Sequence, residues 1–414
     1  MSVRVLFCCI LIACQGLLAA HADTKRPNPP ASVCIGSNCV STPTPGGKIK
    51  WNPGHYMASG TTLYGGSQIA NVSSEMADLN GWDKILGYRI LITWGAIETS
   101  KGVYDFTLLD AILSKLKTQY GKPKQLVIAL LPGQFGGKFY QGSGSTMPVY
   151  LTQSSAYGPS PVAGSYGWWG TNSNGASTGP FCAALFRPAV MDRYIALIQA
   201  LAAHYDNDPN VEAIMFQEDS WMQGLWYGAP DYAADGSNAI AQMQRLLTAS
   251  TAAFAHTSVI MENTWAGTVA GTMAFQNWMN QNRIAPGSSD VLGQTAFDNY
   301  AYAIHMAWGL QALIGVANGT VKFADMRSTS RAMMDVEAAE ISGPYFGKYG
   351  GPFTPLDIVN ALNQTYKASH AFWTHLFGTE RSYGTIPAGA KWPALAATVS
   401  ANPLTNTSYP PNYN

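Results

Sequence analysis

The sequence predicts an α/β fold, a (β/α)8 TIM barrel with a long aromatic-rich loop after its third strand. Short apolar runs alternate with longer amphipathic stretches from Lys48 to about Ala397, the pattern of parallel strands joined by helices. Eight such units fit in this span, as a barrel with insertions requires. The alternative is a doubly wound open sheet, but its glycine-rich phosphate-binding motifs are absent from the sequence.

The expected strands are short and mostly apolar, which is typical of strands that are covered on both faces. They are residues 49–56, 88–94, 125–131, 211–218, 258–262, 291–297, 332–337 and 371–377. Amphipathic helices are expected between them, including residues 108–117, 188–204, 240–255, 302–316 and 355–370.

The first 22 residues have the features of a secretory signal peptide. Arg4 precedes an apolar run that is too short to span a bilayer, and Ala20-His21-Ala22 supplies a cleavage site. The alternative is a lipoprotein box that would anchor the chain through Cys14. We therefore expect a secreted or periplasmic protein with a Pro/Ser-rich segment at residues 23–46, a catalytic barrel at 47–400 and a C-terminal tail at 401–414.

The cysteines fit an oxidising compartment. Cys34 and Cys39 lie close together among small and polar residues, so we expect a local disulfide bond, with two free thiols as the alternative. Cys182 is then left over. The cysteines are not accompanied by paired histidines, so we expect neither a metal site nor a cofactor.

The composition indicates the kind of partner. With 24 basic and 24 acidic residues the formal net charge is zero, which gives no indication of the basic surface of a nucleic-acid binder, so we expect no nucleic-acid partner. Charged residues make up only 12% of the chain and aromatic residues another 12%, a balance that suits a neutral, hydroxylated, flat-faced partner. We expect a carbohydrate substrate, no membrane span and a monomer.

A long segment, residues 133–186, follows the expected third strand. Loops of this length are uncommon and are usually functional. In a barrel it would rise over the C-terminal face, where active sites lie. We interpret it as a cleft wall with aromatic platforms for sugar rings; the alternative is a surface excursion packed on itself. Its aromatic residues include Phe135, Tyr140, Tyr150, Tyr157, Tyr166, Trp168 and Trp169.

The expected fourth strand ends abruptly in polar residues. Gln217 and Glu218 follow an apolar run, and Trp221 comes shortly after. Burying such groups is costly unless they are paired or used. A carboxyl group held against an aromatic ring has a raised pKa, as a general acid near neutral pH needs. Glu218 is therefore the candidate acid, and a structural cluster that closes the strand is the alternative.

The expected seventh strand offers a second carboxyl group. Hydrolysis of a glycosidic bond generally uses two carboxyl groups, one to protonate the leaving oxygen and one to attack or to activate water. Strands four and seven lie across a barrel mouth, so Glu218 and Glu337 can flank a bond between them. Glu340 competes with Glu337 for this role.

The second strand and the helix after it resemble those of clan A glycoside hydrolases, the retaining (β/α)8 enzymes that include many cellulases, β-mannanases and β-galactosidases. The resemblance rests on Gly87-Tyr88-Arg89-Ile90-Leu91-Ile92-Thr93-Trp94, followed by Glu98, Gly102, Tyr104-Asp105-Phe106 and Leu109-Asp110. It implies that Arg89 supports the catalytic carboxylates, that Glu218 is the acid/base and that Glu337 is the nucleophile.

The resemblance implies two further contacts and shows one departure. Trp373 would close the sugar site from the eighth strand, and Tyr300 would contact the nucleophile from the sixth. Gln217 stands where the clan usually has asparagine, so contact with the sugar 2-hydroxyl would come from a longer side chain or be lost. The seventh-strand sequence matches no particular family of the clan.

Other polar residues near strand ends have weaker roles. Glu262 closes the fifth strand and is expected to bind substrate or to be structural, while Glu98 is expected to order the second loop. His55 and Tyr56 would contact the substrate if they end the first strand, or else lie in the core.

The sequence thus predicts a retaining glycoside hydrolase for a β-linked polysaccharide or oligosaccharide. The alternative function is a catalytically inactive carbohydrate-binding barrel. A serine hydrolase is disfavoured, because the closest approach to its motif, Ala163-Gly-Ser165-Tyr-Gly167, lacks the first glycine and lies in the long loop.

Overall fold

The structure is a computed structural model that divides into two compact units, Met1–Thr42 and Pro43–Asn414. It describes residues 48–132, 147–158, 183–216, 231–233, 236–262, 274–275, 277–279, 281–287, 355–375, 391–410 and 413, and the backbone of strands at 32–35, 38–41 and 332–336.

The first unit contains a short hairpin. Strands β1 (Ser32–Ile35) and β2 (Asn38–Ser41) pair antiparallel, and the register sets Cys34 opposite Cys39. The disulfide bond between these cysteines stays a prediction.

The second unit is organised around an eight-stranded sheet in which every pair of neighbouring strands is parallel. The order β10-β9-β8-β7-β4-β3-β12-β11 follows the chain once around the sheet. The strands are β3 (Gly54–Leu63), β4 (Ile85–Thr93), β7 (Gln125–Leu131), β8 (Val211–Phe216), β9 (Ser258–Glu262), β10 (Ile284–Gly287), β11 (Ala332–Val336) and β12 (Ala368–Thr374).

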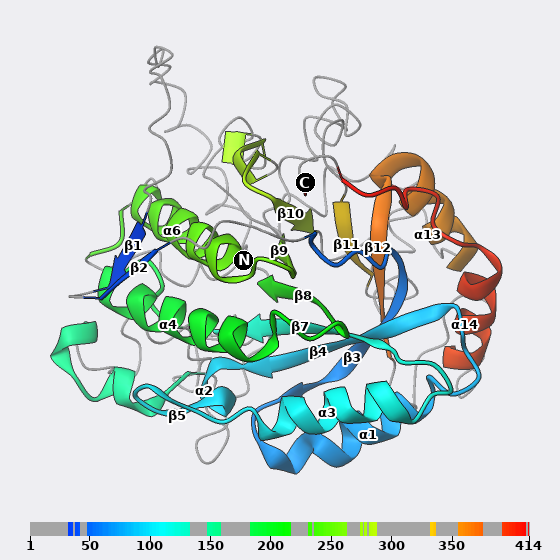
Figure 1. Cartoon of the computed structure of the whole chain (residues 1–414), viewed down its shortest axis with the longest axis horizontal. Helices are drawn as coiled ribbons and strands as arrows, with labels where there is room; N and C mark the ends of the chain where they lie inside the picture. Colours follow the sequence, from blue (N-terminus) through cyan, green and yellow to red (C-terminus); the bar gives the residue numbers. More distant parts are fainter. Residues whose placement is uncertain are drawn as a thin grey trace, which may run out of the picture. The chain divides into compact units, whose positions relative to one another are not determined.

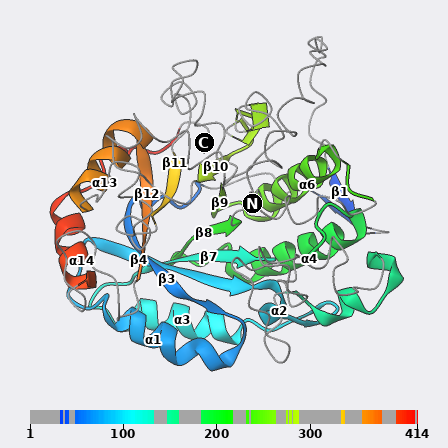
Figure 2. The same ribbon diagram turned by 180° about the vertical axis from the view of Figure 1, so that it is seen from behind.

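The sheet curls into a barrel. β10 and β11 stand at opposite ends of the hydrogen-bonded order, yet their Cα atoms approach within 8 Å, and Figures 1 and 2 show them side by side. Parallel strands that alternate with helices and return on themselves define a (β/α)8 barrel, so the predicted fold class is confirmed.

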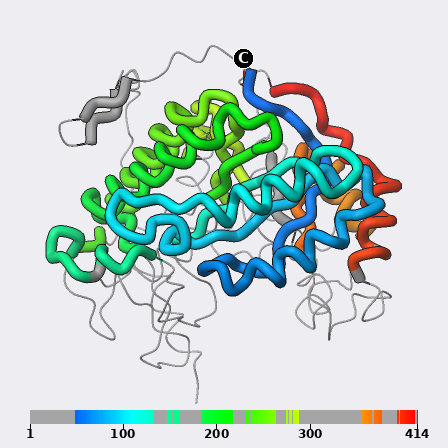
Figure 3. The backbone as a smooth tube through the Cα atoms, turned by 60° about the horizontal axis from the view of Figure 1, so that its bottom comes forward, coloured from blue at the N-terminus to red at the C-terminus, as the bar shows by residue number. Residues whose placement is uncertain are grey.

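Helices lie outside the sheet in both views (Figures 1 and 2), and α4 and α6 pack against each other (Figure 3). None of the helices in the described part of the chain combines the length and apolar character needed to cross a membrane. The main helices are α1 (Ile69–Ala77), α3 (Thr107–Thr118), α4 (Pro188–Tyr205), α6 (Ser237–Ala253), α13 (Pro355–Ala361) and α14 (Lys391–Ala401).

The barrel interior combines small and large side chains. Small residues leave room for the rings of Tyr56 and Phe372. Gly87 serves the same purpose, because a Cβ atom there would lie 2.8 Å from Tyr56 Cε1 and 2.2 Å from the Gln125 carbonyl oxygen. The cluster consists of Tyr56, Ala58, Val127, Ala129, Ala213, Met215, Ile260, Ala285 and Phe372.

The expected elements match the structure best where they are uniformly apolar. Strands 125–131 and 258–262 are confirmed residue for residue. The first strand was expected too early, since β3 begins only at Gly54. Beside β9 the sixth position is filled by β10 (Ile284–Gly287), and the expected strand 291–297 lies outside the described residues, as does helix 302–316. Helix 355–370 is too long, because β12 starts at Ala368.

Aromatic residues near the C-terminus cover the amino-terminal end of the barrel. The Trp51 ring lies 5.7 Å from that of Tyr413 and 5.0 Å from that of His370, and its indole nitrogen donates to the Thr407 carbonyl at 2.9 Å.

His370 is bonded to the fully buried Glu212 at 3.0 Å. Burial alone would raise the pKa of Glu212, but the bonds from His370 and Asn52 outweigh it and hold that pKa below its usual value.

His55 belongs to the same end of the barrel. The Trp373 indole can only donate, so its 3.0 Å bond goes to an unprotonated His55 Nδ1, and His55 Nε2–H donates to the Asn402 carbonyl at 3.0 Å. Both nitrogens are thus used by the neutral ring. Burial lowers the pKa of His55 to about 4.

We predict that His55 makes the protein sensitive to acid. A depressed pKa stabilises the folded state above the unfolded pKa of about 6.5, and this stabilisation is lost as the pH falls towards 4, by about 3 kcal/mol. Urea unfolding at pH 7 and at pH 4 measures it. His55→Gln keeps an acceptor for Trp373 and a donor for Asn402 but cannot titrate, so its free energy of unfolding should fall less over this range. Parallel pH profiles for the two proteins would contradict the assignment.

Candidate functional site

The carboxyl ends of the barrel strands form one rim, because all the strands run in the same direction. β8 ends at Phe216 and β11 at Val336, so Glu218 comes two residues after one strand and Glu337 directly after the other. The side chains of several predicted site residues lie outside the described residues: Gln217, Glu218, Trp221, Tyr300, Glu337 and Glu340.

Arg89 is in the barrel interior, and its predicted support of the catalytic carboxylates stays a prediction. It sits on β4 between Ala58 and Val127 of the neighbouring strands, is 1% exposed, and its guanidinium carbon lies 5.9 Å from the centre of the Phe372 ring. A guanidinium held among apolar side chains needs anions or acceptors nearby. The barrel therefore holds a fixed positive charge four residues before the end of β4.

Glu262 is the last residue of β9 and is fully buried. Side chains alternate along a strand, so it shares the inward face with Ile260, a member of the interior cluster. Arg89 and Glu262 are thus the two predicted site residues that the described structure brings to the barrel interior.

Trp373 lies elsewhere. Phe372 belongs to the interior cluster, so Trp373, the next residue on β12, points to the opposite face of the sheet. It is fully buried there and donates to His55. The expectation that Trp373 closes the sugar site is therefore wrong. His55 and Tyr56 likewise stand at the start of β3 rather than at its end, and Tyr56 is a core residue.

A fully buried carboxylate, Glu98, fixes the loop after β4. Its Oε2 accepts the Trp94 indole N–H at 2.7 Å, and its Oε1 accepts the backbone N–H of Gly102 at 2.8 Å. Oε1 also accepts bonds from Arg193 on α4 at 2.7 Å and from the Tyr150 hydroxyl at 2.9 Å. We call these five residues the Glu98 hub. The expectation that Glu98 orders the second loop is confirmed, but sequence reasoning missed Arg193 and Tyr150.

A second anchor joins two other loops on this side of the barrel. Arg187, just before α4, bonds Asp231 through Nε at 2.6 Å and through the second guanidinium arm at 3.0 Å. These bonds lower the pKa of Asp231. Arg187 also donates to the Tyr157 carbonyl at 3.4 Å and packs against Gly158, which has a φ of 125° and no room for a Cβ atom. Sequence reasoning missed this anchor, because Arg187 and Asp231 lie 44 residues apart along the chain.

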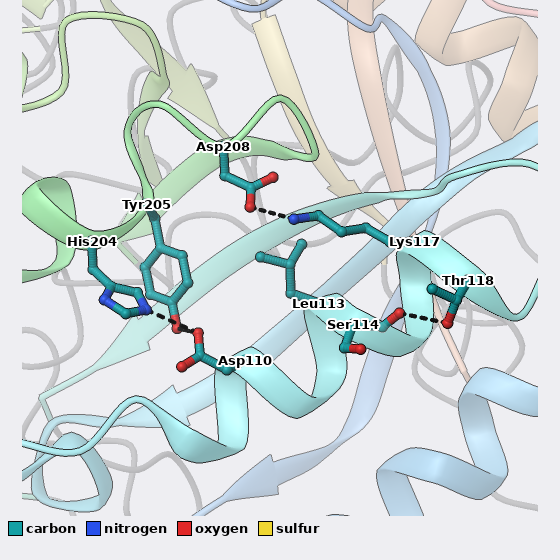
Figure 4. Close-up of a pocket in the computed structure, with 8 residues that line it drawn as sticks. All are labelled: Asp110, Leu113, Ser114, Lys117, Thr118, His204, Tyr205 and Asp208. Carbon is teal, nitrogen blue, oxygen red and sulfur yellow. Dashed lines mark hydrogen bonds and ion pairs between the residues drawn. The ribbon is translucent and has the colours of Figure 1, made fainter.

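A surface hollow of about 270 Å³ lies on the outer wall between α3 and α4 (Figure 4). Its charged groups face one another: Lys117 pairs with Asp208, and Asp110 accepts bonds from Tyr205 at 2.8 Å and from His204 at 3.0 Å. Because these groups already satisfy each other, we assign the hollow no part in the chemistry. Among the described residues there is also no cluster of His, Cys, Asp and Glu that could hold a metal ion.

No protein-family model matches the chain, and a comparison with curated proteins finds no match. Solved structures do match. Endo-glycoceramidase II from Rhodococcus sp. is 14% identical, with 84% of this chain and 78% of that one covered and a TM-score of 0.46. A cold-adapted β-galactosidase from Rahnella sp. R3 is 10% identical, with 86% and 58% covered and a TM-score of 0.47. A GH5_18 protein from Streptomyces cattleya, in complex with Manβ1-4GlcNAc, is 10% identical, with 84% and 80% covered and a TM-score of 0.49.

These similarities do not identify the family of this chain. The fold assignment rests on the direction, order and closure of its own strands.

We predict that Glu98→Ala lowers the free energy of unfolding by about 3–5 kcal/mol, because it leaves the Arg193 charge, whose side chain is only 18% exposed, without its carboxylate and three further donors without this acceptor. Chemical denaturation measures the change. Asp83→Ala is the control, since the Asp83–Lys122 pair has side chains 63% and 74% exposed and should contribute less than about 1 kcal/mol. Equal effects of the two substitutions would show that the hub is not structural.

Proposed function

We propose that the chain is a retaining glycoside hydrolase that cleaves β-linked bonds of a polysaccharide or oligosaccharide outside the cytoplasm. The observation that supports it most is the common rim on which β8 and β11 end. Two residues of extended chain span at most about 7 Å, so covalent geometry keeps Glu218 close to the end of β8 and Glu337 closer still to the end of β11.

In this proposal the reaction has two steps. A Glu337 carboxylate oxygen attacks the anomeric carbon, while Glu218 gives its proton to the departing glycosidic oxygen as the carbon–oxygen bond breaks. Glu218 then takes a proton from water, whose oxygen attacks the anomeric carbon and releases Glu337. Retention requires the two carboxyl groups to be about 5–5.5 Å apart, whereas inversion requires about 6.5–9.5 Å.

The described residues supply the surroundings for such a pair. Arg89 provides positive charge inside the barrel, and a cation near a carboxylate favours its ionised form, which a nucleophile needs. Glu262 adds an acceptor at the end of β9 for a substrate hydroxyl. We propose Gln217, Trp221 and Tyr300 as further contacts with the sugar.

A catalytically inactive carbohydrate-binding barrel is the second candidate. It is favoured by Gln217, since the longer side chain changes the contact that the clan makes with the sugar 2-hydroxyl. Such a protein would bind oligosaccharides with wild-type Glu218 and Glu337 and release no product.

We predict that Glu218→Gln and Glu337→Ala each lower kcat on a polysaccharide by a factor of about 10² or more, because each removes one of the two carboxyl groups that the reaction needs. Reducing-sugar release from a panel of β-linked glucans, mannans and galactans measures the loss. Glu340→Ala is the matched control, because it also removes a glutamate carboxyl group and lies only three residues after Glu337. The larger loss for Glu340→Ala would transfer the role of nucleophile to Glu340.

Proton NMR of the first product tests the stereochemistry. A β-configured product that later mutarotates agrees with retention, and an α-configured one rejects the two-step mechanism. Binding of oligosaccharides without turnover by the wild-type protein would establish the second candidate instead.

A further inference from the structure

We infer that the Glu98 hub holds residues 147–158 as a preformed wall at the carboxyl rim of the barrel, which contacts an extended glycan chain beyond the bond that is cleaved. The substrate class rests on the proposed function. Glu98, Arg193 and Tyr150 are positioning residues, and the exposed side chains of the wall contact the substrate.

The wall is held at both ends. Tyr150 donates to Glu98 Oε1 at 2.9 Å and accepts from Arg193 Nε at 3.0 Å, so its ring is fixed by a carboxylate and a guanidinium together. At the other end, Tyr157 accepts from Arg187 through its carbonyl at 3.4 Å. The rings of Tyr150 and Tyr157 also meet edge to face at 5.7 Å. A segment pinned in this way loses little entropy when a ligand binds.

The hub is tied to the strand that leads to Glu218. The ring of Trp94, which donates to Glu98, lies 4.8 Å from that of Tyr194 on α4. The Tyr194 ring in turn lies 6.1 Å from that of Phe216, the last residue of β8. These rings are buried, so the wall and the end of β8 are parts of one packed structure.

Apolar side chains are exposed next to the hub. Val149 precedes Tyr150, and Val103 precedes Tyr104, whose hydroxyl accepts a 3.2 Å bond from Arg193. Each valine is 55% exposed, more than the third large exposed apolar side chain of the described residues, Leu356 at 43%. Exposed apolar groups beside fixed polar ones suit the face of a sugar ring, which carries C–H groups with hydroxyls around its edge.

The test compares a polymer with a small substrate. The polymer is whichever β-linked polysaccharide the wild-type protein hydrolyses, and the small substrate is the 4-nitrophenyl β-glycoside of the same sugar, which is too short to reach the wall. Val149→Ser should raise KM for the polymer by roughly three- to tenfold relative to KM for the glycoside, with similar kcat. Leu356→Ser, an equal change on the exposed face of α13, is the control.

The hub is tested in the same assay with Tyr150→Phe, which removes only the bridging hydroxyl. The same selective rise in KM is expected, because the variant loses two hydrogen bonds, one to Glu98 and one from Arg193, and each corresponds to a factor of roughly two to ten. Tyr205→Phe is its control, since the hydroxyl of this tyrosine donates to a carboxylate on the outer wall (Figure 4). An equal rise in KM for the polymer and for the glycoside overturns the proposed wall, and so does an equal rise in the two control variants. An unchanged KM for the polymer in Val149→Ser and Tyr150→Phe overturns it as well.

Calorimetric titration with cellohexaose and mannohexaose separates this inference from the proposed function. Binding without hydrolysis contradicts the hydrolase, yet weaker binding by Val149→Ser and Tyr150→Phe than by their controls still supports the wall. Absence of both hydrolysis and binding overturns the two together.

Discussion

In a closed sheet of parallel strands every carboxyl end opens on one rim, and the side chains of each strand alternate between the interior and the helix layer. These two constraints determine where each candidate residue of this chain can act. The first brings the ends of β8 and β11 to the same rim although they are more than a hundred residues apart. The second directs Ile260 and Glu262 inwards and turns Trp373 towards the helix layer.

Only 12% of the residues are charged, and several of the carboxylates are buried at places where they fix a loop or join two strands. Glu98 fixes the loop after β4, and Glu212 ties β8 to His370. Glu75, on α1, accepts bonds from Tyr88 at 2.5 Å, Ser59 at 3.0 Å and the backbone N–H of Gly60 at 3.1 Å, close to the irregularity in the register of β3. Each carboxylate is surrounded by several donors, which offset the cost of removing it from water.

Strands β7 and β9 are predictable from the sequence, because burial leaves each a continuous apolar run and a strand covered on both faces has no polar interruptions. Strands that break this pattern are not. The second half of β3 is Ser-Gly-Thr-Thr-Leu, and β10 is Ile-Ala-Pro-Gly, which reads as a turn. Trp373 shows the sharper limit: adjacent strand residues face opposite ways, so a role carried over by resemblance depends on a register that one sequence does not determine.

The partners of Glu98 could not be predicted either, since Tyr150 and Arg193 reach it from segments 52 and 95 residues away. The use of charged and polar side chains in the Glu98 hub is explained by the directionality of their hydrogen bonds and not by the stability that they add. Buried ion pairs add little net stability over apolar packing, because desolvation consumes most of the Coulomb attraction. Hydrogen bonds to a carboxylate are directional, however, and an apolar cluster of equal volume would tolerate several orientations of the Tyr150 segment. The Glu98 hub therefore suits the rim of the barrel, where a fixed position of the Tyr150 segment matters more than any stability that the hub adds.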